Sequence, residues 1–189
     1  MKKENVLTIV VALLVGLLGG YLIFNIAGNK ETPGYQGIPE GAGSPLDYKV
    51  RIAEAEKVVE RDPKNAQAWN QLANDYFDTD QPQKAVHAYD KVLELEPKNT
   101  NALTDQGIMY RKIGWYDKAI ANFEKAQSID PKHLQSLYNL GVVYLVDLKQ
   151  PDKARQIWTK YLQFDSISPT AQQIKADLAN MSRQPGEQH

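Results

Sequence analysis

The 189-residue sequence contains no cysteine, which excludes disulfides, thiol nucleophiles and cysteine-based zinc or iron–sulfur sites. Its three histidines, His87, His133 and His189, are too few and too scattered for a typical metal cluster. Neither sign of charge dominates, because 22 Lys and Arg face 23 Asp and Glu. A net charge of −1 argues against a nucleic-acid-binding domain. No catalytic constellation, metal site or cofactor motif is found, so the sequence favours a binding module over an enzyme.

One long apolar run is present near the start of the chain. Residues 6–27 carry no charge, and a helix of this length reaches roughly 30 Å, the thickness of a bilayer core. We therefore predict a transmembrane signal-anchor helix at 6–27, after a cytoplasmic start at 1–5. A cleaved signal peptide is the alternative. Its apolar core is usually only about 7–15 residues, and bulky Phe24 and Asn25 lie near the best cleavage point.

The charges that flank this run set its predicted orientation. Lys2 and Lys3 precede it, whereas Lys30 and Glu31 follow it and cancel. The positive-inside rule then places the N-terminus in the cytoplasm and the rest of the chain outside it. In a bacterial cell this describes a single-pass protein of the inner (plasma) membrane with a periplasmic domain. The reversed topology, with the domain in the cytoplasm, is the alternative.

Small residues recur along the predicted membrane helix at Ala12, Gly16 and Gly20. This spacing gives a flat stripe on which two helices can pair, and so suggests a homodimer through the membrane helix. Glycine is also simply frequent in membrane helices, which is the alternative explanation. Residues 28–45 follow with five glycines and three prolines, which is typical of a spacer that buries no core.

A period of 34 residues organises the rest of the chain. Four columns keep it: Trp69, Leu103 and Leu137; Ala73, Gly107 and Gly141; Tyr76, Tyr110 and Tyr144; Pro63, Pro97 and Pro131. Within a unit, apolar residues fall at i, i+4 and i+7, stop at a turn, and begin again, which indicates two helices per unit. The small residues Ala73, Gly107 and Gly141, with Ala85 and Ala119 at the same interval, allow the paired helices to approach closely. A proline closes the first two units.

The pattern resembles the tetratricopeptide repeat (TPR) family, over about 100 of the 189 residues. The resemblance implies an all-α superhelix with repeats at 66–99, 100–133 and 134–168. The third repeat has one extra residue within 145–152 and lacks the closing proline. We predict capping helices at 46–62 and 169–181, because terminal repeats must cover their apolar faces. The tail, 182–189, is predicted to be disordered.

The resemblance further implies a concave groove, lined by the first helix of each repeat, that holds peptide segments of other proteins. The residues expected to bind there are Asn70, Asn74, Phe77, Ile108, Arg111, Tyr138, Asn139, Val142 and Leu145. Amide side chains can hydrogen-bond a peptide backbone, and the apolar residues can bury side chains. Val142 and Leu145 could instead face a neighbouring helix. Asn70, Gln135 and Asn139 stand where some family members have a basic clamp, which argues against carboxylate-terminal tails as ligands.

These observations predict a membrane-anchored adaptor that holds partner proteins during complex assembly, with no cofactor and no nucleic acid. A raised effective concentration near the bilayer would favour capture of membrane partners. Two more specific alternatives are a c-type cytochrome maturation factor that holds the apocytochrome, and a pilus or outer-membrane assembly factor. A third is a regulatory subunit of a membrane enzyme. No residue selects among them.

Overall fold

The computed structural model describes residues 45–183, which lie in the unit Glu40–His189. Within this range the chain forms eight α-helices and one π-helix, and no strand. In chain order they are α2 (Pro45–Arg61), α3 (Ala66–Asp78), α4 (Pro82–Leu95), α5 (Thr100–Lys112), α6 (Tyr116–Ile129), α7 (Leu134–Val142), η1 (Val143–Asp147), α8 (Pro151–Phe164) and α9 (Pro169–Arg183). The predicted membrane helix, the spacer up to residue 44 and the tail from 184 lie outside it, and none of the helices in the described range is long and apolar enough to span a bilayer.

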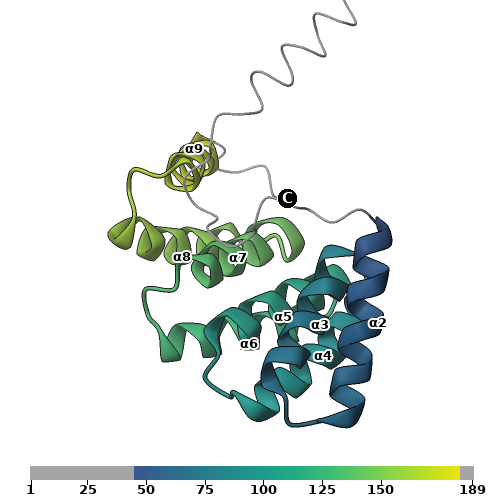
Figure 1. Ribbon diagram of the computed structural model, residues 1–189. Coiled ribbons are helices and arrows are strands. Elements are labelled where there is room, and N and C mark those ends of the chain that lie inside the picture. The colour runs from purple at the N-terminus through teal and green to yellow at the C-terminus, as the bar shows by residue number, and fades with distance from the viewer. Residues whose placement is uncertain (1–44, 184–189) are drawn as a thin grey trace, which may run out of the picture. The chain divides into compact units, whose positions relative to one another are not determined.

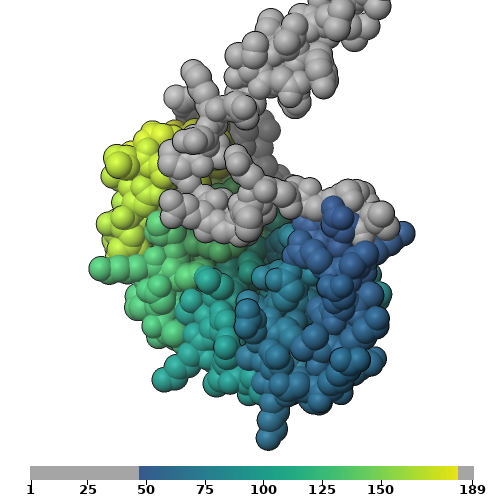
Figure 2. Space-filling model, viewed as in Figure 1, coloured from purple at the N-terminus to yellow at the C-terminus, as the bar shows by residue number. Residues whose placement is uncertain are grey.

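The helices pack as consecutive antiparallel pairs. Helix α3 pairs with α4, α5 with α6, and α7 with α8, while α4 also packs on α5 and α6 on α7. Figure 1 shows this order, with α2 and α9 at the two ends of the stack. The described surface in Figure 2 accordingly runs from blue at α2, through teal and green, to yellow at α9. The 34-residue units of the sequence are thus the hairpins of an all-α repeat stack.

The first helix of every repeat begins at the same kind of N-cap. The Asn65 side chain accepts a hydrogen bond from the Ala68 N–H at 2.9 Å, and Asn99 accepts one from Ala102 at 3.0 Å. His133 and Ser168 occupy the same column and cap α7 and α9 in the same way, at 3.3 Å and 3.1 Å. Such caps satisfy amides that would otherwise lack a partner at a helix start. Helix α9 therefore begins where a fourth repeat would begin.

The turn inside each hairpin repeats as well. Asp80, Gly114 and Lys149 have φ angles of 58°, 79° and 54°, so each turn contains one left-handed residue. The backbone N–H of the next residue donates a hydrogen bond to the carbonyl of the tyrosine in the first helix. Gln81 donates to Tyr76 at 2.9 Å, and Trp115 donates to Tyr110 at 2.8 Å. Glycine adopts this conformation without strain, which suits Gly114, whereas aspartate and lysine carry a modest cost there.

The extra residue of the third repeat is accommodated by η1. The equivalent turn bond here joins Gln150 to Tyr144 at 2.7 Å and spans six residues, where the first two repeats span five. The π-helix Val143–Asp147 takes up the difference within the first helix of the hairpin. Insertions of one residue into an α-helix commonly take this form. The hairpin can therefore close in the same way despite its additional residue.

The core consists of two clusters of buried side chains. The larger one runs from α2 to α8 and includes Tyr89 and Phe123, and the smaller one gathers Trp158 with residues of α7 and α9. Leu145 and Ile157 pack against both clusters and join them. All of these side chains lie between residues 52 and 181, so the fragment 40–189 contains both clusters.

Helix α2 takes the place of the second helix of a preceding repeat, since it packs on α3 as α4 packs on α5. It begins at Pro45 and ends at Arg61, one residue earlier at each end than the predicted range 46–62. Arg51 forms an ion pair with fully buried Asp75, and Tyr76 donates a hydrogen bond to Glu56 at 2.5 Å. Burial raises the pKa of Asp75, although the hydrogen bond from Gln71 and the charge of Arg51 oppose the shift.

Candidate protein-binding face

Helices α3, α5 and α7 form one layer of the stack, and α4, α6 and α8 form the other. Helix α3 contacts α5, and α5 contacts α7, whereas the helices of the second layer make no comparable contacts with one another within residues 45–183. The closer spacing places the α3–α5–α7 layer on the inner side of the curve. We refer to its solvent-facing side as the concave face. All nine residues predicted to bind peptide lie on α3, α5, α7 or η1.

Three of the polar residues predicted to bind peptide are engaged within the protein. Asn74 accepts a hydrogen bond from the Tyr89 hydroxyl at 2.8 Å, and Asn139 donates one to the Gln135 carbonyl at 2.8 Å. Arg111 makes a two-point ion pair with Asp147, at 2.5 Å and 3.3 Å. Asn74 and Arg111 thus join different helices, whereas Asn139 bonds within α7, and each offers a ligand only its remaining hydrogen-bonding capacity. The sequence pattern did not indicate these internal partners.

The apolar residues of the set are half-buried. Phe77, Ile108 and Leu145 pack against the larger core cluster, while Val142 packs against the smaller one. Tyr138 stacks on Trp158 with ring centroids 6.4 Å apart. These side chains therefore contact neighbouring helices and also keep part of their surface exposed. The structure brings the whole set together on one layer. Asn70, which is also half-buried, lies on α3, the first helix of that layer.

The concave face carries negative charge at its N-terminal half. Asp105 on α5 has its pKa raised to about 6, mainly because it is desolvated by burial. The hydrogen bond from Gln135, at 3.3 Å, opposes this shift, and the charge of Asp78 adds to it. Asp78 itself accepts a hydrogen bond from Tyr48 at 3.2 Å.

Within the described residues, no group of three or more His, Cys, Asp or Glu side chains could hold a metal ion.

His133 connects the second and third repeats, a role that the sequence analysis missed. Its Nδ1 caps α7, and its Nε2 lies 3.0 Å from the Asn101 Oδ1. An amide oxygen only accepts, so Nε2 carries the proton and Nδ1 is free to act as the cap acceptor. The signal that could have revealed this is the column itself, which reads Asn65, Asn99, His133.

Acidification is expected to weaken this cap. Burial lowers the pKa of His133 below its usual value, and Asp130 opposes the shift only in part. The folded protein then binds this proton less tightly than the unfolded chain does. The contribution of the neutral His133 cap to the free energy of unfolding is therefore complete above about pH 6.5, and it is lost as the pH falls below that value. We expect a loss of about 1 kcal/mol in the free energy of unfolding between about pH 7 and pH 5.

The matched control is His133→Asn, which copies the residue of the first two repeats. Urea unfolding at several pH values, followed by circular dichroism, measures the difference between wild type and variant. Asp105 contributes in the opposite direction, because an acid with a raised pKa stabilises the fold as the pH falls, but it is present in both proteins and cancels. If the free energy of unfolding changed equally with pH in wild type and variant, the role assigned to His133 would be wrong.

Family comparisons agree with the repeat architecture. Four family profiles match the chain: three are described as tetratricopeptide repeat, at residues 66–99, 88–121 and 135–164, and one as TPR repeat, at 107–146. Together they cover residues 66–164, more than half of the sequence. The chain belongs to the tetratricopeptide repeat family, whose fold supports binding to other proteins.

Solved structures show the same fold. A crystal structure of MamA is 19% identical with a TM-score of 0.63, and the alignment covers 79% of this chain and 97% of MamA. PilF of Pseudomonas aeruginosa is 25% identical with a TM-score of 0.63, covering 73% of this chain and 63% of PilF. The Arabidopsis OM64 TPR domain is 18% identical with a TM-score of 0.57, and the alignment covers 61% of this chain and 95% of the OM64 domain. The comparison with curated proteins finds no significant match.

Proposed function

We propose that this protein is a membrane-anchored adaptor that binds segments of partner proteins along its concave face and catalyses no reaction itself. The observation that carries the proposal is the gathering of half-buried apolar side chains from α3, α5 and η1 on one layer of a TPR stack. Half-buried side chains can gain apolar contacts on binding without having to leave the core.

The proposed ligand is an extended or helical segment with apolar side chains. Ile108 and Leu145 would contact those side chains, together with Val146, which is 47% exposed at the end of the same layer. Polar contacts to the segment would come from Asn70 and from the remaining Oδ1 of Asn139. The amides whose hydrogen bonds are used inside the stack, above all Asn74, would have a smaller part than the sequence suggested.

Photo-crosslinking from defined positions tests this assignment without disturbing the core. A photoreactive amino acid is placed at an exposed concave position, Gln67 or Val146, or at an exposed position of the second layer, Ala121 or Gln156. We expect the concave positions to crosslink the same partner proteins in cells, because the segment would lie along them. The yield from the second-layer positions should be about tenfold lower.

Three outcomes decide the result. Equal yields from both layers, with wild-type circular dichroism for every variant, would contradict a concave binding face. Crosslinks confined to the second layer would contradict it as well. Loss of the crosslink at Val146 when Ile108 is replaced by alanine would link the capture to the apolar strip.

The membrane part of the proposal depends on residues 6–27, which lie outside the described range. Their uncharged length supports an anchor, and the flanking charges support a cytoplasmic N-terminus with the TPR domain in the periplasm. An anchor restricts the domain to the bilayer surface and raises its effective concentration near membrane partners.

Protease accessibility in spheroplasts measures this topology. We expect added protease to digest the TPR domain in spheroplasts but not in intact cells, because only the outer membrane would shield a periplasmic domain. Lysed spheroplasts provide the control for intrinsic sensitivity. Protection until lysis would support the reversed topology, and recovery of the chain in the soluble fraction would contradict the anchor.

A further inference from the structure

A hollow of about 610 Å³ lies between α2 and α4, on the second layer of the stack. Its floor is apolar and aromatic, and is formed by Val59, Trp69, Leu72, Tyr76 and Ala88. Two carboxylates one helical turn apart, Glu56 and Glu60, line its α2 side, and Gln83, Lys84 and His87 line its α4 side. Apolar concavities of this size with a few charged groups at the edge are typical binding sites.

The repeat explains why this hollow is open. The position of Ala88 is taken by Asn122 in the second repeat and by Ile157 in the third. Asn122 donates to the Gln106 side chain at 2.7 Å, and Gln106 donates to Asp90 at 2.7 Å, so hydrogen-bonded polar side chains occupy the space beside Asn122. Ile157 fills the third with apolar contacts. Alanine is the smallest of the three residues, and Ala88 lies fully buried beneath the hollow.

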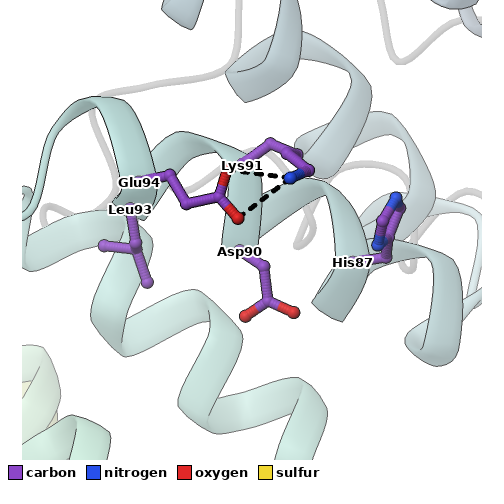
Figure 3. A pocket seen from close by; sticks show the side chains of 5 residues that line it. All are labelled: His87, Asp90, Lys91, Leu93 and Glu94. Atoms are coloured by element: carbon purple, nitrogen blue, oxygen red, sulfur yellow. Dashed lines mark hydrogen bonds and ion pairs between the residues drawn. The ribbon is translucent and has the colours of Figure 1, made fainter.

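One period further on, Asp90, Leu93 and Glu94 occupy the positions of Glu56, Val59 and Glu60 and border a smaller hollow of about 400 Å³. Figure 3 shows Lys91 reaching Glu94 there, with the Lys91 Nζ 2.8 Å and 2.9 Å from the two carboxylate oxygens. That carboxylate is thus neutralised by its own helix. The hollow beside α2 is the larger of the two and has the apolar floor.

The opposite end of the stack departs from the repeat in a complementary way. The turns that precede α3, α5 and α7 carry Lys64, Lys98 and Lys132, all exposed. The equivalent residue before α9 is Ile167, which is 86% exposed. A large apolar side chain on a tight turn cannot contribute to the core from there, and so it has no evident role within the single chain.

The turn that carries Ile167 is held rigidly. The Asp165 Oδ1 accepts the N–H groups of Ile167 and Ser168, both at 3.1 Å. Lys175 donates its Nζ to the Ser166 carbonyl at 2.7 Å, which places a positive charge beside the exposed isoleucine. The protein thus presents an apolar side chain with an adjacent cation at one end. At the other end it presents an apolar hollow edged by carboxylates on α2 and by Lys84 on α4.

We propose that the hollow binds Ile167 of a second copy of this chain, with Lys175 of that copy placed against Glu60. The hollow and the Ile167 turn lie at opposite ends of the stack, so the contact is head-to-tail and leaves one unused site at each end of the assembly. A contact of this size is weak in solution, with a Kd on the order of 1 mM. Attachment of many copies to one surface would raise the local concentration into this range.

Sedimentation equilibrium of the fragment 40–189, which contains both core clusters, tests the proposal without any contribution from the predicted membrane helix. We expect the average mass to rise with concentration up to about 1 mM and the increase to continue past the dimer. Ile167→Lys copies the other three turns and should weaken association about tenfold. Ala88→Ile, which copies the third repeat, should do the same. Because Ala88 is buried, surface variant Glu60→Lys serves as a second test on that side.

Mixing distinguishes head-to-tail contact from any symmetric dimer. Ile167→Lys retains the hollow and Ala88→Ile retains the isoleucine, so the two variants together should form a heterodimer that grows no further. The double variant Glu60→Lys, Lys175→Glu should recover the association that either single change removes. A monomer at every concentration up to about 1 mM would overturn the proposal, as would association that Ile167→Lys leaves unchanged.

Discussion

Replacement of Trp158 by alanine is expected to lower the free energy of unfolding by about 3–5 kcal/mol. Trp158 is 2% exposed and belongs to the smaller core cluster, which attaches α9 to α7 and α8. Its Nε1 also donates to the Tyr138 carbonyl at 3.2 Å, and its ring stacks on Tyr138. Removal leaves a cavity that a stack of rigid helices cannot fill by collapse.

The matched control is Trp115→Ala, the same substitution at a tryptophan that is 50% exposed in the turn between α5 and α6. Trp115 stacks on Tyr110 but lies outside both core clusters, so we expect a loss below about 1 kcal/mol. Urea unfolding followed by far-ultraviolet circular dichroism compares the two variants without using tryptophan emission. Similar losses for both would contradict the assignment of Trp158 to the core.

Substitution of Gly141 by alanine has the second-largest expected effect. A Cβ at this position would overlap the Trp158 indole, whose Nε1 and Cδ1 are the nearest atoms. The ring would have to shift and release its hydrogen bond to Tyr138. We expect a net loss of about 1–3 kcal/mol, even though alanine is intrinsically about 1 kcal/mol better than glycine inside a helix.

The first repeat supplies the compensating change. Ala73 and Tyr89 occupy the positions of Gly141 and Trp158, and both are buried there. In a Trp158→Tyr background, Gly141→Ala should therefore cost much less than in wild type, with a coupling of about 0.5–3 kcal/mol in the double-mutant cycle. If Gly141→Ala instead stabilised the wild-type protein, as it would at an exposed helical glycine, the close approach of the indole would be wrong.

Periodicity made the repeat architecture predictable. Columns such as Tyr76, Tyr110 and Tyr144 fix the register of each hairpin, and the one-residue delay after the third tyrosine locates the extra residue. Spacing counts residues but does not say where a helix takes up an additional one. The π-helix Val143–Asp147 therefore came only from the structure.

The binding face was less predictable for a physical reason. Repeat positions tell which layer a side chain belongs to, and α3, α5 and α7 do form one layer. Repeat positions do not tell which neighbouring side chain a residue contacts, because the contact depends on the distances between repeats. Asn74 meets the Tyr89 hydroxyl and Arg111 meets Asp147, two contacts that separate columns of the sequence cannot reveal.

Departures from the repeat were the most informative positions. His133 in an asparagine column, Ala88 among larger residues and Ile167 in a lysine column each correspond to a structural feature: a titratable cap, an open hollow and an exposed apolar turn. Because the repeats share one backbone conformation, a residue that differs from the others in its column indicates a local structural difference. The same comparison within one chain applies to any repeat protein.

Amide hydrogen exchange of residues 45–183 shows whether partners bind along the concave face. It is measured on the free protein and on the protein crosslinked to its partner through position 146. We expect added protection on α3, α5 and α7, and we expect α4 and α6 to exchange as in the free protein. Protection confined to α4, α6 and α8 would contradict binding along the concave face.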